Sequence, residues 1–438
     1  MSKKFSSALA LLTLFCLLAG SLLQPVLGQT ATARTGQNAA IVSTADAVLK
    51  ETSEIRELAI LRGVKSGAQS RSEIERMIIK NLDSETTPAE MHATEMLLKA
   101  FGLAPPDFAY RPFLIKLLAE QVAGYYDPKA QQFYLADWIE IDGQKPVMAH
   151  ELTHALQDQH FNLKRFEKWP KGDSDAELAA HALIEGDATL AMTQYLTKHP
   201  MIALAFLRTS QDTSTEQFKQ APRALQESLL FPYQQGSAWA TRIYARGGWA
   251  MVSNAFAKLP QSTEQILHAD KYFSYEPPVK LTLPNFRPAL GPGWKRIDND
   301  VNGEWGYYLV LDEYLNDVPE SKRAAAGWGG DRFAIYEGPT ASDVFLAQVT
   351  AWDTTSDAKE FFDAYLKRTE KRFPDISKFG DRISPNGDQR QEWKTQSGRG
   401  VIEMRGSRVV ILEGVPAKAN VNKLLEMMWQ QRSQPRKS

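Results

Sequence analysis

The chain has 438 residues, with 51 basic and 52 acidic side chains and a formal net charge of −1. Proteins that bind nucleic acid usually carry a basic excess, so this balance argues against such a partner. Hydrophobic residues make up 43% of the chain and charged residues 24%, which is typical of a globular protein. The length predicts two or three domains, and no pattern in it specifies an oligomeric state.

The first 28 residues have the pattern of a secretory signal peptide. Two lysines precede an apolar run over 8–23, and residues 26–28 offer a cleavage site. The run is shorter than the roughly 20 residues of a spanning helix, although an uncleaved N-terminal anchor is the alternative. The only cysteine, Cys16, lies in this segment, so no intramolecular disulfide is expected. We predict a secreted or periplasmic protein with no membrane association beyond this segment.

The next part of the chain is predicted to be a linker followed by helices. Residues 29–46 are mostly small and polar, as in a linker, whereas apolar residues recur at helical spacing over 47–99. Thr87-Pro88-Ala89-Glu90 has the pattern of a helix start, with a capping threonine, proline in the first turn and glutamate three positions after the cap. That helix is expected to reach about Phe101, and another is predicted over 111–122.

A short hairpin and three long helices follow. Asp127-Pro128 marks a turn and Gln132–Leu135 has strand character, so Tyr125–Leu135 is predicted to form a hairpin. Helical patterns then cover 147–161, 175–197 and 233–258, the last interrupted near Gly247-Gly248. Residues 47–284 are therefore expected to form a mainly helical lobe with a short edge-strand hairpin.

The C-terminal part has a different character. Five prolines between Pro277 and Pro292 mark the clearest domain boundary in the chain. Strand-like runs then occur at 332–336, 344–350, 400–405 and 408–412, and helical runs at 356–373 and 420–431. We predict an α+β protein in which residues 293–432 form a C-terminal α+β domain with an antiparallel sheet that folds separately from the helical lobe.

The sequence His-Glu-Leu-Thr-His at 150–154 is the strongest chemical signal. Positions i and i+4 of a helix lie on one face, so His150 and His154 can bind the same metal ion. Glu151 is rotated by about 100° from His150, toward a water on the ion rather than the ion itself. Only seven histidines occur, so the chance expectation of this string is on the order of 0.01 per chain. A solvated helix with idle histidines is the alternative.

A catalytic zinc site usually has three protein ligands, so a third is needed. Glu185 lies among apolar residues, where an ionised carboxylate is costly unless it is paired or bound to metal. Gly186 beside it would permit close approach to the first helix. A pairing of Glu185 with lysine or arginine is the alternative, and His181, one turn earlier, is the competing ligand. Asp187 and Asp158 are candidates for orienting the histidines.

His150–His154 together with Glu185-Gly186-x-Ala188 resembles the gluzincin branch of the zincin metallopeptidases, in particular a poorly characterised bacterial and archaeal group. The resemblance covers roughly residues 110–275. It implies a zincin-like metallopeptidase domain over 47–284, with one zinc ion held by His150, His154 and Glu185. Many gluzincins carry an acidic residue four positions after the glutamate ligand, but Thr189 stands there in this chain, which leaves the partner of the histidines open.

Other residues are weaker candidates. In zincins an edge strand before the motif holds the substrate backbone, and Tyr125–Leu135 has that place, although a purely structural hairpin is equally compatible. Tyr233 and His268 are candidates to stabilise the oxyanion, with a packed aromatic ring or a structural histidine as the alternatives. Tyr244 is a weaker candidate of the same kind, and no site pattern includes His92, His160 or His199.

These features together predict an exported zinc metallopeptidase that acts on peptide or protein substrates. Zn²⁺ would polarise the scissile carbonyl, and Glu151 would act as the general base toward water. The first alternative is a catalytically idle zincin fold used for binding or scaffolding, against which the intact Glu151 argues. The second is a metal-dependent hydrolase of a non-peptide amide, which would need the same ligands and base.

Overall fold

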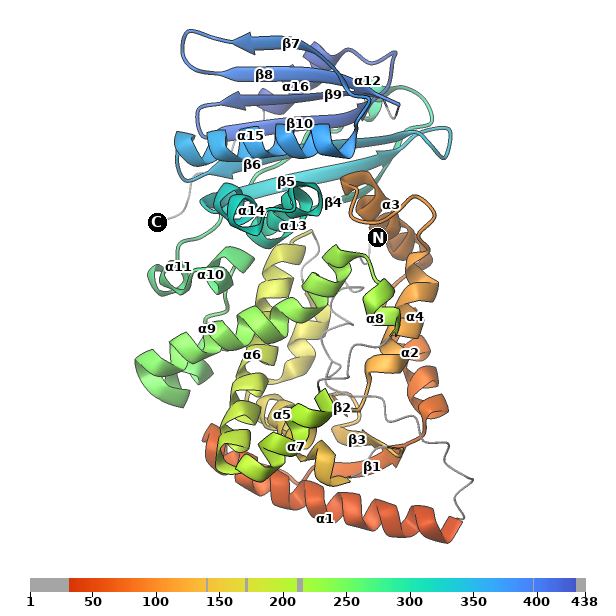
Figure 1. The fold of residues 1–438 in the computed structure, drawn as a ribbon, viewed down its shortest axis with the longest axis vertical. Coiled ribbons are helices and arrows are strands. Elements are labelled where there is room, and N and C mark those ends of the chain that lie inside the picture. The colour runs from red at the N-terminus through yellow and green to blue at the C-terminus, as the bar shows by residue number, and fades with distance from the viewer. Residues whose placement is uncertain (1–30, 139–140, 170–171, 211–215, 397, 431–438) are drawn as a thin grey trace.

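A computed structural model describes residues 31–138, 141–169, 172–210, 216–396 and 398–430. The signal segment predicted over 1–28 lies outside these residues. The described chain is α+β, with helices forming one end and an antiparallel sheet with its covering helices forming the other (Figure 1). None of the helices in this part of the chain combines the length and apolar character needed to cross a bilayer.

The first part of the chain is mainly helical, with one small sheet. Its helices are α1 (Ala31–Arg56), α2 (Arg71–Glu85), α3 (Pro88–Phe101), α4 (Tyr110–Gln121), α5 (Ile141–Phe161), α6 (Ser174–Lys198), α7 (Pro200–Ser210), α8 (Glu216–Gln220), α9 (Arg223–Ala255), α10 (Thr263–Leu267), α11 (Ala269–Ser274) and α12 (Arg287–Leu290), with a 3-10 turn at Leu163–Lys168. Its strands are β1 (Lys65–Gln69), β2 (Gly124–Asp127) and β3 (Gln132–Ala136).

The second part alternates strands and helices. Its strands are β4 (Lys295–Asp300), β5 (Trp328–Glu337), β6 (Val344–Trp352), β7 (Ser377–Ile383), β8 (Gln389–Thr395), β9 (Gly398–Arg405) and β10 (Arg408–Val415). Its helices are α13 (Gly303–Leu315), α14 (Val318–Ala325), α15 (Thr355–Arg372) and α16 (Val421–Trp429).

The linker predicted over 29–46 is wrong, because α1 begins at Ala31 and continues to Arg56. Small residues such as alanine favour a helix as much as a flexible segment, and the apolar positions that decide the matter are sparse here. Ile41, Ala45, Val48 and Leu49 are nevertheless buried, at the spacing of one helical face. This segment is therefore part of the core of the helical lobe.

The predicted hairpin is present, and a third strand joins it. β2 pairs antiparallel with β3, with Tyr125 opposite Tyr134. β1, which the helical pattern over 47–99 concealed, pairs parallel with the other side of β3, so the order is β1-β3-β2. A five-residue strand with only one apolar side chain carries little periodicity, which explains the omission. β2 is thus an edge strand, as predicted.

Three local predictions are confirmed. The Thr87 side chain accepts from the backbone N–H of Glu90, and Glu90 accepts from the backbone of Thr87, so the capping box at the start of α3 is complete. α3 ends at Phe101, where Gly102 takes the left-handed conformation with φ 77°. The long helix α9 has non-helical backbone angles at Gly247 and Gly248, where an interruption was expected.

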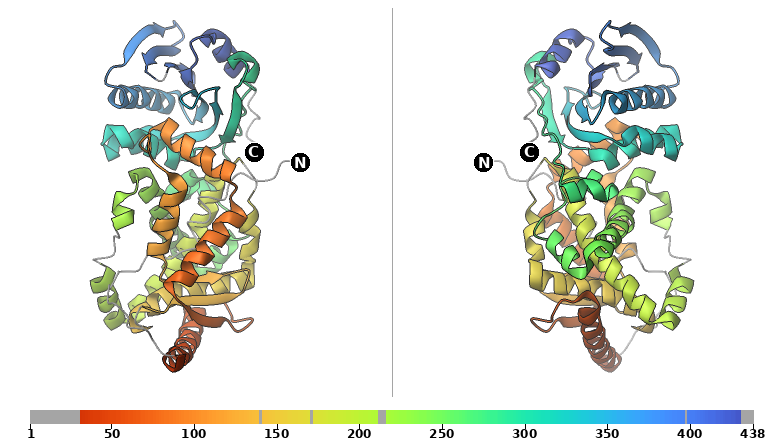
Figure 2. Two further views of the ribbon diagram at one scale, coloured as in Figure 1. Left: turned by 90° about the vertical axis from the view of Figure 1, so that its right-hand side faces the viewer. Right: turned by 90° about the vertical axis from the view of Figure 1, so that its left-hand side faces the viewer.

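The C-terminal sheet has seven antiparallel strands in the order β4-β5-β6-β10-β9-β8-β7. Alternate side chains of β10 belong to two different cores, with Ile411 on one face and Val410 on the other. One face is covered by α13 and α15 and the other by α12 and α16 (Figures 1 and 2). The sequence missed β4, β7 and β8, whose residues are largely polar or exposed, and it missed α13, which is buried on most sides.

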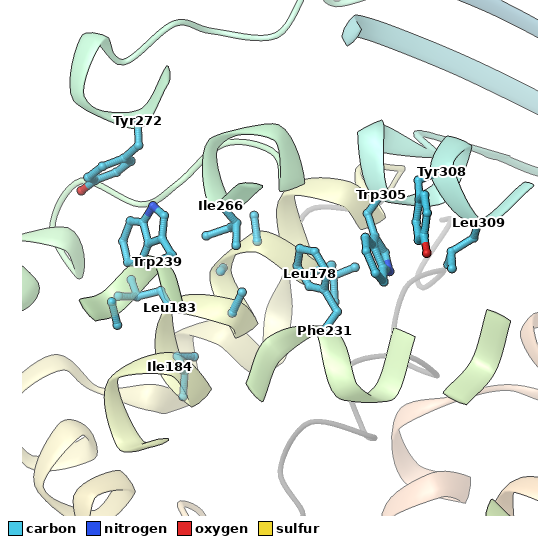
Figure 3. Packing of buried hydrophobic residues seen from close by; sticks show 14 of the residues in the cluster. Leu178, Leu183, Ile184, Phe231, Trp239, Ile266, Tyr272, Trp305, Tyr308 and Leu309 are labelled. Atoms are coloured by element: carbon cyan, nitrogen blue, oxygen red, sulfur yellow. The ribbon is translucent and has the colours of Figure 1, made fainter. Parts of the chain in front are cut away.

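Separate folding of the two parts, as predicted from the proline-dense connection, does not agree with their packing. One hydrophobic cluster extends from α1 through the helical lobe into α13, α15 and the sheet. Figure 3 shows Trp305 of α13 facing Phe231 of α9 and Leu178 of α6, and the Trp305 and Phe231 ring centroids lie 4.7 Å apart. Prolines lower the number of local contacts in a connection, but they carry no information about contacts on either side of it.

Hydrogen bonds also join the helical lobe to the C-terminal α+β domain, which we call the sheet domain, and the region where the two meet is the junction. The buried carboxylate of Asp175, at the start of α6, accepts from the backbone N–H and hydroxyl of Thr263, and that hydroxyl also accepts from the N–H of Trp305. At the other side of the junction, Arg372 of α15 donates to the carbonyls of Ala100 and Lys99 at the end of α3. A helix from the sheet domain therefore caps a helix of the helical lobe.

We expect Trp305→Ala to destabilise both parts of the molecule together. Loss of a buried tryptophan costs about 3–5 kcal/mol, and the shared core transmits that loss to both sides. Urea unfolding followed by hydrogen exchange and mass spectrometry is expected to give one transition for the helical lobe and the sheet, at lower urea than in the wild type. Two separated transitions, with the helical lobe unaffected, would contradict the shared core.

The acidic residues Asp298 and Asp300 of β4 are expected to make the free energy of unfolding depend on pH. Burial raises the pKa of Asp298 to about 7, and the nearby Asp300 carboxylate adds to the shift. An unfolded aspartate titrates near 4, so the folded state retains a proton that the unfolded state loses. The stabilisation from this group is complete below about pH 4 and is lost as the pH rises through about 7. The melting temperature of Asp298→Asn minus that of the wild type should therefore increase between pH 5 and pH 8, when both proteins are measured in the presence of a metal chelator. An equal difference at every pH would exclude this effect.

Candidate metal centre

The candidate site is built where α5, α6 and α9 meet. The crossing of α6 and α9 is unusually close, because a Cβ atom on Gly186 would lie 2.2 Å from the carbonyl oxygen of Gly236, and a Cβ on Gly236 would lie 2.2 Å from that of Ala182. Gly186 was expected to permit approach to the motif helix α5, but its neighbour is α9. The crossing matters for the site, because Glu185 precedes Gly186 and Tyr233 lies one turn before Gly236.

The side chains of His150, His154 and Glu185 converge, as expected. The Nε2 atoms of the two histidines are 3.1 Å apart, and Glu185 Oε2 lies 3.1 Å from His150 Nε2 and 3.4 Å from His154 Nε2. All three residues are buried. Nitrogen and oxygen atoms of His150, His154 and Glu151 also lie within 4.8 Å of one another, so this buried group can hold a metal ion.

Glu151 lies beside this group and is held by β2. Its Oε2 accepts a hydrogen bond of 2.9 Å from the backbone N–H of Tyr126. The Tyr126 hydroxyl donates to Asp158, which lies about two turns after Glu151 on α5, so Tyr126 joins β2 to α5 at two points. Asp158 also accepts from Leu163 and Arg62, and it thereby positions the chain around α5 rather than a histidine ring.

The charges of the three converging residues are coupled. Burial raises the pKa of Glu185, but the charges and hydrogen bonds of His154 and His150 together outweigh burial and lower that pKa to about 2. Burial lowers the pKa of His154, but the charge and hydrogen bond of Glu185, together with the Glu151 charge and the Gln157 hydrogen bond, outweigh burial and raise that pKa to about 9. For His150, burial dominates and lowers the pKa. These directions describe an ionised Glu185 paired with a protonated His154, beside a neutral His150.

Asp187 is the other residue that was suggested to orient the histidines. It is connected to His154 by Gln157, which the sequence analysis did not identify. Gln157 Oε1 lies 2.8 Å from His154 Nδ1, and Gln157 Nε2 donates to Asp187 Oδ2 at 2.9 Å. Gln157 is three positions after His154, so its place on the same helix face was available from spacing alone. The remaining partner of Asp187 is Arg56 at the end of α1, and no local pattern points to it.

Of the two oxyanion candidates, Tyr233 lies at the site. Its half-buried ring is 6.0 Å from the ring of His150, centroid to centroid. His268 lies at the junction with the sheet domain, where its Nε2 bonds to Glu304 of α13 at 2.8 Å. Figure 1 shows α10 and α11 beside α13 and α14, at the other end of the lobe from β2 and α7. The structure therefore brings only Tyr233 to the three converging side chains.

The other histidines contact different parts of the fold. His181 is buried on α6 and lines a cavity of about 190 Å³ between α3, α6, α9 and α13, and burial lowers its pKa to about 4. His199 bonds to Glu51 of α1, and His160 to the carbonyl of Ala59. His92 pairs with Glu337, which joins α3 to β5, while the Tyr244 ring packs on Trp249 at 4.9 Å.

Comparison with known proteins gives a match in the C-terminal region. Residues 291–425 match a family described as a domain of unknown function, DUF8575. The match covers the sheet domain from β4 into α16 and includes none of His150, Glu151, His154 and Glu185. No curated protein matches the chain, and no solved structure matches it.

Gly186→Ala is expected to disturb the site through the crossing of α6 and α9. The added methyl group meets backbone atoms that cannot move independently, and such overpacking typically costs about 1–3 kcal/mol. Because Glu185 is adjacent, the variant should also bind zinc more weakly, which isothermal titration can measure. The matched control is Gly143→Ala, at an exposed helical position of α5 with open space around it, where stability should be unchanged or slightly higher. Equal behaviour of the two variants would contradict the role of the crossing.

Proposed function

We propose that the chain is an exported zinc-dependent peptidase in which His150, His154 and Glu185 hold the ion and Glu151 is the general base. The convergence of the three side chains carries this proposal. Tetrahedral ligands at about 2.0–2.2 Å from zinc lie about 3.3–3.6 Å apart, and the three separations of 3.1, 3.1 and 3.4 Å are close to that value. Two imidazoles and a carboxylate are donors that suit zinc.

The protonation of the site is compatible with a bound cation. His154 carries its extra proton because the ionised Glu185 is beside it, and both Nε2 atoms point toward the same space. A divalent cation would take over the role of that proton by neutralising the Glu185 carboxylate. Binding would then release a proton from His154, as is general for histidine ligands.

The residues around this group support a hydrolytic reaction. Zinc held there would supply a Lewis acid that polarises the scissile carbonyl and lowers the pKa of the attacking water. Glu151 would take the proton of that water and pass it to the leaving amine, while the N–H of Tyr126 holds the carboxylate in place. Tyr233, next to His150, is the candidate to donate a hydrogen bond to the developing oxyanion.

A peptide is the substrate that the surroundings favour. β2 is an edge strand, and its residue Tyr126 contacts the proposed base directly. An extended peptide that added to this edge would bring a backbone carbonyl toward the site. The signal pattern over 1–28 is the reason for proposing export. A non-peptide amide would use the same ligands and base, and an idle scaffold would have no use for a base oriented in this way.

Glu151→Gln is expected to keep the fold and the zinc and to lose most hydrolysis. The amide accepts no proton at neutral pH, so cleavage should fall by at least about 100-fold, while the ligands remain intact. A broad peptide library, digested by the zinc-loaded protein and analysed by mass spectrometry, measures the cleavage. Elemental analysis and circular dichroism measure metal content and fold.

Glu75→Gln is the matched control, because Glu75 is exposed on α2 and the change in side chain is the same. It should cleave as the wild type does. Cleavage by Glu151→Gln at the control rate would remove Glu151 from the mechanism. A zinc-loaded wild type that hydrolyses small amides but no peptide would replace the proposal with the non-peptide alternative, and one that hydrolyses neither would favour the scaffold.

A further inference from the structure

A continuous buried chain of hydrogen bonds runs from α1 to the candidate metal centre. Arg56 Nε donates to Asp187 Oδ1 at 2.5 Å, Gln157 Nε2 donates to Asp187 Oδ2 at 2.9 Å, and Gln157 Oε1 lies 2.8 Å from His154 Nδ1. Arg56, Gln157 and Asp187 are each 0% exposed. These hydrogen bonds connect three helices, with Arg56 on α1, Gln157 and His154 on α5, and Asp187 on α6.

The partners of Gln157 determine which ring nitrogen of His154 is free. The amide nitrogen of Gln157 faces two acceptors, the Asp187 carboxylate and the carbonyl of Ile184 at 3.0 Å. Its oxygen must therefore face His154, and since this oxygen can only accept, His154 Nδ1 must carry a hydrogen. In the neutral ring the lone pair is then on Nε2, the atom that lies 3.1 Å from His150 Nε2.

Arg56 stabilises this arrangement electrostatically. An isolated carboxylate at the position of Asp187 would be strongly disfavoured by burial, and the guanidinium of Arg56 neutralises it. Arg56 is itself held by the hydroxyl of Ser253 at 3.2 Å and by the ring of Trp249, whose centroid is 4.5 Å away. Each oxygen of Asp187 accepts from one of these donors, and Gln157 is the residue that connects Asp187 to His154 by hydrogen bonds.

The two histidines differ in this respect. His150 Nδ1 is buried and has no hydrogen-bond partner among the described residues, whereas His154 Nδ1 has Gln157. Among the described residues, the ring nitrogen that faces away from the converging side chains is therefore hydrogen-bonded in His154 and not in His150. Because the first donor of the chain of bonds is on α1, the orientation of His154 depends on a helix nearly one hundred residues before the motif.

We propose that Gln157, Asp187 and Arg56 are positioning residues for the metal centre, with Gln157 fixing the tautomer and orientation of His154 and the Arg56–Asp187 pair fixing Gln157. This inference rests on the proposed function only in that a metal ion binds His154. Partners of this kind typically change metal affinity by about 10–100-fold.

The test exchanges the amide of Gln157 and the carboxylate of Asp187 between the two positions. Gln157→Glu alone places two carboxylates together, and Asp187→Asn alone leaves Arg56 without its anion. The double variant Gln157→Glu/Asp187→Asn again provides one amide and one carboxylate. His154 Nδ1 can then donate to one oxygen of the introduced carboxylate, and the introduced amide can donate to the other. Each single variant should bind zinc about 10–100-fold more weakly than the wild type, and the double variant should recover part of that loss, because the carbonyl of Ile184 still lacks its amide donor.

A second readout does not need a metal. The Nδ1-bound hydrogen of His154 should give a slowly exchanging resonance in the nitrogen-labelled protein, and Gln157→Met, which keeps the size of the side chain but has no acceptor oxygen, should abolish it. Arg62→Gln is the control, because the Arg62 side chain pairs with Asp158 of α5 and not with the side chains of His150, His154 or Glu185. It should retain both the resonance and the zinc affinity.

The outcomes separate this inference from the proposed function. The positioning role would be overturned if the double variant bound zinc no more tightly than the single variant with the lower zinc affinity. It would also be overturned if Gln157→Met kept the wild-type resonance and zinc affinity. A wild type that binds no zinc would overturn the proposed function, and the resonance in Gln157→Met would still decide the hydrogen-bond assignment.

Discussion

Backbone contact between α6 and α9, made by Gly186 and Gly236, is the constraint on which the helical lobe and its site depend. Two helices that touch without intervening side chains have little freedom to slide, because every displacement brings backbone atoms into collision. The contact lies next to Glu185 on one helix and one turn from Tyr233 on the other. α5 then needs only to pack against this pair for its two histidines to meet the carboxylate.

Burial of acidic side chains is the second theme, and three of those on α6 have partners from other elements. Glu185 on α6 is paired with His154 on α5, Asp187 on α6 with Arg56 on α1, and Asp175 at the start of α6 with the N–H and hydroxyl of Thr263. These are three of the four buried acidic residues of α6, and unpartnered carboxylates there would oppose folding strongly. Because their partners come from α1, α5 and the start of α10, α6 acts as the axis that holds the lobe together.

The sheet domain shares one hydrophobic core with the lobe, although the family match covers the sheet domain alone. The match over 291–425 begins well after His150 and His154 in the sequence. Nevertheless, α13 packs against the helical lobe through Trp305 and Phe231, and α15 caps the end of α3. In this chain, the sheet domain without the helical lobe would expose the large aromatic side chain of Trp305 to water.

The sequence by itself determined what depends on neighbours along the chain. Spacing of four residues put His150 and His154 on one face, the Thr87 capping box placed the start of α3, and the apolar surroundings of Glu185 indicated a carboxylate that needs a partner. Only the tertiary structure decided what crosses between distant segments: the place of Tyr233 but not His268 at the site, the helical nature of residues 31–46, and the chain of bonds from Arg56 to His154. Arg56 and Asp187 are 131 residues apart, and no periodicity links them. Their contact exists because hydrophobic packing of α1 against α5 and α6 brings two buried charges together, and periodicity along a chain reports which face of an element is buried but not which element covers it.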